Sequence, residues 1–101
     1  MRVTIASATQ WTTVPGLIWT RFEDSDEYVV FHPESGDIHL LTSSAHRLWH
    51  LVADQKTATL EELVAQLAAD LRRPPDAQLA SAAHDTLHFM DHAGLIRPLS
   101  R

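Results

Sequence analysis

The sequence predicts an α+β domain in which a three-stranded antiparallel β-meander precedes a three-helix bundle, in the order β-β-β-α-α-α. Apolar residues alternate with period two in short runs between residues 17 and 41, as strands with one buried face require. After residue 42 the apolar spacing changes to steps of three and four, which is typical of amphipathic helices. A chain of 101 residues supports one modest core, so the sheet and the helices must share it.

The strands are predicted from this alternation and from the turns between them. The first strand begins at Leu17, and the charged segment EDSDE at 23–27 indicates a hairpin loop after it. Residues 28–32 are β-branched or aromatic and predict the second strand. The segment PESG then suits a four-residue turn into the third strand, residues 37–41.

The N-terminal segment has a different composition. Residues 1–15 alternate only weakly and end in a Pro-Gly turn. This composition predicts a loosely held arm, with an extra strand if Trp11 anchors it. The folded domain is expected to cover residues 16–101.

Three helices are predicted, over about residues 43–54, 60–71 and 76–93. Their ends carry residues that cap helices well. These are Thr42 or Ser43 for the first helix, Thr59 with Glu62 for the second, and Asp76 and Gly94 for the two ends of the third. The segment RRPPD ends the second helix, because proline lacks the backbone donor. Leu95 and Ile96 are expected to fold back over the core.

Composition excludes several functional classes. The formal charge of −5 disfavours a phosphate backbone as partner, and the absence of cysteine excludes disulfides and thiol chemistry. The sequence has no long apolar segment and no secretion signal, so we expect a cytoplasmic protein with no membrane partner. It also lacks a GxSxG elbow. We therefore expect neither an enzyme nor a bound cofactor or metal.

Several segments together resemble the PqqD-like family of small peptide chaperones. They are VPG, the stretch YVVFHPESGDIHLLTSSAHRLW and the terminal GLI. Within that family, the sequence is most similar to the subgroup associated with HPr-kinase-related peptide-modification systems. The resemblance runs from about Trp11 to Ile96. The sequence departs from the family pattern at Thr42, where family members often carry asparagine.

The resemblance implies a winged-helix-like domain, the RiPP recognition element. Such a domain binds the leader segment of a ribosomally made precursor peptide and presents it to a modifying enzyme, here one of HPr-kinase-related type. The leader adds as a strand to the edge of the third strand and lies against the third helix. An ordinary strand whose edge meets only solvent is the alternative.

The implied peptide-binding residues come from these two elements. The strand supplies Asp37, Ile38, His39, Leu40 and Leu41, and the helix supplies Ala80, Ala83, His84, Leu87, His88 and Asp91. Ile38 and Leu40 share one face of the strand. The pattern leaves open which face meets the core.

Histidines recur every four residues at His84, His88 and His92. The first two could chelate a metal ion, but HDTLH lacks the glutamate of the HExxH motif. The third lies about 12 Å from the first, too far to share one ion. A solvated helix flank is one alternative. The other is a peptide-groove wall whose charge changes near neutral pH. A second pair, His46 and His50, is expected to be exposed.

Two rival functions follow from the same element order. A DNA-binding winged helix would offer basic side chains from its recognition helix. The third helix instead has no Lys or Arg between Asp76 and Gly94, which disfavours a nucleic-acid partner. A structural or assembly subunit without peptide specificity is the other rival, as a homodimer through Phe89 or the free strand edge.

Overall fold

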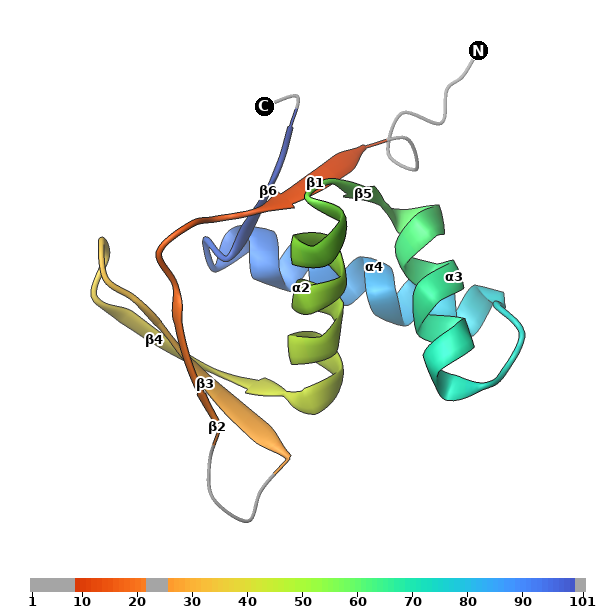
Figure 1. The fold of residues 1–101 in the computed structure, drawn as a ribbon, viewed down its shortest axis with the longest axis horizontal. Coiled ribbons are helices and arrows are strands. Elements are labelled where there is room, and N and C mark those ends of the chain that lie inside the picture. Colours follow the sequence, from red (N-terminus) through yellow and green to blue (C-terminus); the bar gives the residue numbers. More distant parts are fainter. Residues whose placement is uncertain (1–8, 22–25, 100–101) are drawn as a thin grey trace.

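The computed structural model describes residues 9–21 and 26–99. In chain order the elements are β1 (Gln10–Thr13), β2 (Ile18–Arg21), β3 (Glu27–His32), β4 (Asp37–Thr42), α2 (Ser43–Gln55), β5 (Ala58–Thr59), α3 (Leu60–Leu71), α4 (Ala77–His92) and β6 (Ile96–Pro98). The predicted α+β class, with a meander followed by three helices, is confirmed. The strands β5 and β6 were not predicted, and both belong to a second small sheet. Figure 1 shows the meander on one side of α2 and α3 on the other.

The meander is an antiparallel sheet in the order β2-β3-β4. Its register places Ile18, Phe31 and Ile38 in one row across the three strands. This row lies on the outer face, where Ile38 is 66% exposed. On the opposite face, Val30 and Leu41 are buried. The core-facing residues of β4 are therefore those in phase with Leu41.

The second sheet has the order β5-β1-β6 and is antiparallel. Trp11 in its central strand β1 pairs with Ala58 and Pro98 and is buried. The extra strand that Trp11 would pin is thus present, inside the segment predicted as an arm. Residues 1–8 of that segment lie outside the described residues, and the boundary at residue 15 stays a prediction.

Local hydrogen bonds fix the start of each helix. The Thr42 side chain accepts from the Ala45 backbone N–H at 3.2 Å. Thr59 and Glu62 form the reciprocal capping box, and Asp76 accepts from the backbone N–H of Leu79 at 2.8 Å. The three predicted N-terminal boundaries are therefore confirmed to within one residue, because each depends on contacts only three residues apart.

The C-terminus of α4 ends in a Schellman motif. Gly94 has φ +82°, and its N–H donates to the Asp91 carbonyl at 3.1 Å. The N–H of Leu95 donates to the Met90 carbonyl at 2.8 Å. This reversal carries Leu95 and Ile96 into the core, where both are buried.

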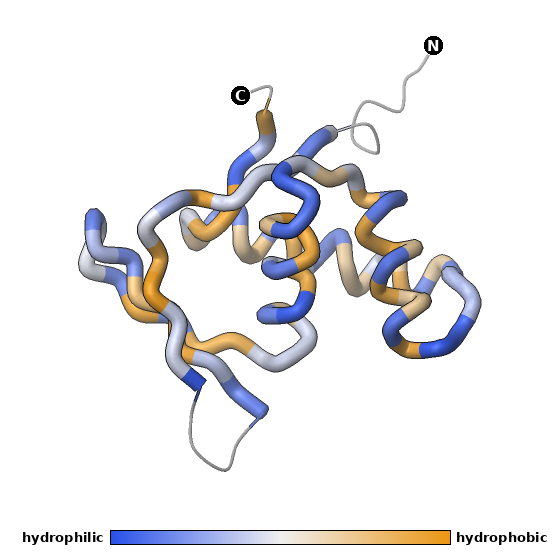
Figure 2. The backbone as a smooth tube through the Cα atoms, viewed as in Figure 1, coloured by the Kyte–Doolittle hydropathy of each residue, from blue (hydrophilic) through white to orange (hydrophobic). Residues whose placement is uncertain are grey.

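The core lies between the inner face of the meander, the three helices and the second sheet. Around α2 and α3, hydrophobic positions alternate with hydrophilic ones (Figure 2), which gives each helix one buried stripe. The largest fully buried side chains come from all of these layers. They are Val30, Leu48, Val52, Leu63, Leu87, Met90, Leu95 and Ile96.

Replacement of Gly94 tests the turn after α4. A Cβ there would meet the His32 ring at 3.6 Å, an ordinary contact, so the cost of Gly94→Ala comes from the left-handed backbone. We expect a loss of about 1–2 kcal/mol in the free energy of unfolding, measured by urea denaturation. Gly94→Asn should lose less, because asparagine tolerates this conformation better. Equal losses in the two variants would contradict this explanation.

Candidate functional site

Strand β4 has one unpaired edge. It pairs with β3 along its whole length, and within residues 9–21 and 26–99 no strand pairs with its other side. An edge strand directs alternate N–H and C=O groups outward. The segment DIHLLT carries neither proline nor lysine, the residues that commonly block such edges. The backbone of β4 is therefore available to an added strand.

A pocket lies beside this edge, between β4, the start of α2 and the middle of α4. Its volume is about 310 Å³, at the low end for ligand pockets. The lining residues are Leu40, Leu41, Thr42, Ala45, Asp85, Thr86 and Phe89. Asp85 is the single charged side chain in this set. The pocket thus suits an apolar side chain of a peptide better than a large cofactor.

His39 and Phe89 approach each other next to this pocket. Phe89 is 49% exposed, and its ring meets that of His39 edge to face, with centroids 6.5 Å apart. The Nε2 atom of His39 is buried and has no hydrogen-bond partner among the described residues. Such an unpaired buried nitrogen is unfavourable.

Comparison with known proteins identifies the family. Residues 27–96 match the family Coenzyme PQQ synthesis protein D (PqqD). The chain belongs to the PqqD family. This match covers β4, α2 and α4, the elements that form the free edge and the pocket. No curated protein matches the chain.

The PqqD-family chain is also similar to a solved structure, described as TbiB1 in complex with the TbiA(beta) leader peptide. The TM-score is 0.66 at 19% identity, over 84% of this chain and 93% of the other. At this identity the match shows a shared fold.

No helix in the described part of the chain is long and apolar enough to cross a membrane.

The five predicted strand residues of this PqqD-family chain divide between two faces. Ile38 and Leu40 are 66% and 51% exposed, on the outer face. Leu41 is buried and lines the pocket, while Asp37 is exposed and His39 half-buried on the same side. All five lie on the edge strand, but only alternate residues direct their backbone N–H and C=O to the free edge, because the others bond to β3.

The six predicted helix residues lie elsewhere on α4. Ala83 and Leu87 are buried in the core, and Ala80 lines a different hollow between α3 and α4. His88 meets Trp11 edge to face, on the flank toward β1. His84 is exposed and Asp91 half-buried.

None of these six side chains lines the pocket beside β4. Core packing occupies the apolar face that carries Ala83 and Leu87, and the exposed His84 and His88 lie outside it. The neighbouring side chains Asp85, Thr86 and Phe89 line the pocket instead. An exposed aromatic outside the apolar stripe is the sequence signal that points to them. The peptide-binding role of all eleven predicted residues stays a prediction.

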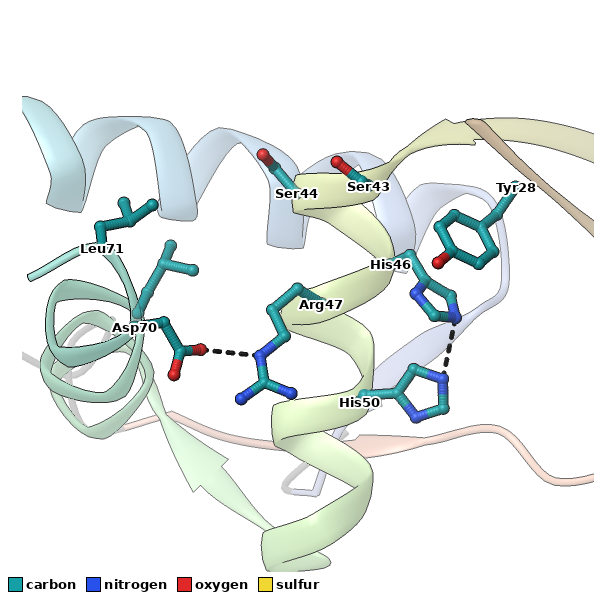
Figure 3. A pocket seen from close by; sticks show the side chains of 9 residues that line it. Tyr28, Ser43, Ser44, His46, Arg47, His50, Asp70 and Leu71 are labelled. Carbon is teal, nitrogen blue, oxygen red and sulfur yellow. Dashed lines mark hydrogen bonds and ion pairs between the residues drawn. The ribbon is translucent and has the colours of Figure 1, made fainter. Parts of the chain in front are cut away.

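A second pocket of about 630 Å³ lies between α2, α3 and Tyr28 (Figure 3). Arg47 on α2 donates to Asp70 on α3 at 2.7 Å across it. The ring of His46 stacks on Tyr28 with centroids 3.5 Å apart. The prediction that His46 and His50 are exposed is wrong, because aromatic rings cover them and leave both half-buried.

Burial, together with a smaller effect of repulsion from His50, lowers the pKa of His46 to about 4. The folded chain therefore holds His46 neutral while an unfolded chain, with a pKa near 6.5, takes up a proton. The folded state therefore has its full stability with respect to His46 above pH 6.5, and the free energy of unfolding decreases as the pH falls from 6.5 toward 4.

We expect His46→Gln to flatten the decline of the unfolding free energy between pH 6.5 and 4. The effect will be smaller than the full pKa shift implies, because solvent reaches the ring. Urea denaturation across this range measures it. His84→Gln removes an imidazole from the exposed flank of α4 and is the matched control. An equal change of slope in both variants would contradict the assignment.

Proposed function

We propose that this chain is a RiPP recognition element, a non-catalytic module that binds the leader segment of a ribosomally made precursor peptide. The observation that carries the proposal is the free edge of β4 beside a mostly apolar pocket on α4. An extended peptide that pairs with this edge gains main-chain hydrogen bonds for affinity. Pockets for alternate side chains then give specificity.

The two faces of β4 define what such a peptide must offer. Side chains of the added strand alternate between the two faces of the extended sheet. Those on the core side reach the pocket that Leu41 and Phe89 line. Those on the outer side lie next to Ile38 and Leu40, which are exposed. A leader with large apolar residues two positions apart therefore matches this edge.

The PqqD-family fold supports the same function. The similar structure of TbiB1 was solved in complex with a leader peptide. A module without catalytic groups still assists the reaction, because it raises the effective concentration of the peptide at the active site of its partner. We propose that this partner is a peptide-modifying enzyme and that both act in the cytoplasm.

Finer assignments extend this proposal. We infer that the partner enzyme belongs to an HPr-kinase-related system, as the resemblance in the sequence suggests. The free chain would form a homodimer through Phe89 or the edge of β4. We also infer that residues 16–101 form the peptide-binding domain. Genes for a precursor peptide and for such an enzyme beside the gene of this chain would support the assignment of the partner. Light scattering of the free chain tests the homodimer.

Titration with synthetic leader segments tests the main proposal. The probes are overlapping peptides from the precursor encoded next to this chain, added to the full ¹⁵N-labelled protein. We expect amide shifts to cluster on β4 and on residues 80–91 of α4. Tight binding with shifts confined to α2 and α3 would overturn the proposed docking mode.

Phe89→Ala tests the pocket separately from the backbone edge. Because the ring is 49% exposed, its removal should leave the fold intact and weaken leader binding about tenfold, measured by calorimetry. Leu71→Ala is the matched control, since Leu71 is a 54% exposed apolar residue on another helix. If the Phe89 variant bound the leader with the same affinity as the wild type, Phe89 would not be part of the binding surface.

A further inference from the structure

The histidine pair on α2 has an unusual arrangement. His46 and His50 are four residues apart, and their Nε2 atoms lie 2.9 Å from each other. Figure 3 shows the two rings turned toward one another beside Tyr28. Both rings line the pocket of about 630 Å³ between α2 and α3. The proposed peptide site does not use either residue, because its pocket has a separate set of lining residues.

Aromatic neighbours hold both rings in place. Tyr28 stacks on His46 with an interplanar angle of 5°, and Trp19 meets the same ring edge to face at 4.9 Å. Trp49 meets the ring of His50 edge to face at 5.2 Å. Two nitrogens are therefore held close together at little further cost in side-chain entropy.

Two nitrogens at this distance either share a proton or share a metal ion. Imidazole nitrogens bind metals at about 2.0–2.1 Å, so an ion equidistant from both would subtend an angle of about 90°. A tetrahedral ion such as zinc would need the nitrogens roughly 3.3 Å apart at the same bond length. A right angle instead matches neighbouring positions of a tetragonal ion, which copper(II) and nickel(II) favour.

We propose that His46 and His50 form a two-nitrogen site for a divalent copper or nickel ion. Among the described residues no group of three or more His, Asp or Glu side chains could hold a metal. The remaining coordination positions are thus filled by water or by a donor from a molecule in the pocket. The sequence predicts no bound metal, and the spacing considered for that prediction is that of His84, His88 and His92 on α4, whose rings are exposed.

The surroundings of the pair support this site. A metal binds imidazole nitrogen, and the Nε2 atoms of both rings lie close together at the same pocket. Tyr28 on β3 stacks on the ring of His46. Within the described residues, the only ion pair that crosses the pocket joins Arg47 to Asp70. Because Asp70 is already bound to Arg47, the two imidazoles provide the nitrogen donors of the pocket.

Calorimetric titration of the full chain with NiCl₂ tests the proposal, with far-UV circular dichroism to confirm folding. We expect His50→Gln to weaken Ni²⁺ binding about tenfold or more, since even the loss of an outer-shell partner commonly costs that much. His46→Phe keeps a ring on Tyr28 and should weaken binding to a similar extent. The matched control is His88→Gln, which breaks the pair His84 and His88, also with ring centroids 4.3 Å apart.

The outcomes separate the two explanations. Binding that survives His88→Gln but is lost in both α2 variants supports the site. Equal loss in the control, or unchanged binding in His50→Gln, overturns it and leaves a hydrogen bond between two histidines. The electron paramagnetic resonance spectrum of added Cu²⁺ gives a second readout. An axial signal with nitrogen couplings that disappears in His50→Gln is expected, and a spectrum identical in wild type and variant would contradict the proposal.

Discussion

The direct junction between β4 and α2 is the constraint on which the rest of the structure depends. Thr42 is both the last residue of the edge strand and the N-cap of the helix. On either side of it, Leu41 and Ala45 are buried. With no linker residue between them, the position of the strand is set by the burial of the helix. An edge strand with one free side would otherwise fray, because it has only half of its backbone hydrogen bonds.

This junction also explains how the molecule keeps an apolar surface exposed. Ile38, Leu40 and Phe89 are each about half or more exposed, which is unfavourable in water. The buried stripe of α2, which includes Leu48 and Val52, anchors the strand that carries the first two. Stability thus comes from one face of the β4–α2 unit, and the other face stays open for a binding partner. The two pockets use different parts of this unit and share no lining residue.

The predictions that succeeded depend on local contacts. The start of each helix follows from a cap and a backbone N–H three residues away, and each meander strand pairs with its neighbour in the chain. The second sheet was missed because its strands are far apart in the sequence and very short. β1 pairs with residues 96–98 and with residues 58 and 59. An alternation of two or three residues is too weak a signal to predict such a pairing.

The sequence by itself determined the meander, the three helices with their caps, and the edge strand as the place to look for a binding site. It also carried the resemblance to the PqqD family. Only the tertiary structure decided which face of β4 meets the core, which residues of α4 line the pocket, and that His46 and His50 face each other. Periodicity defines which side chains share a face, but the rotation of one element against another follows from packing across the whole core. For that reason Ala83 and Leu87 became core residues, while Asp85 and Phe89, on the same helix, line the pocket.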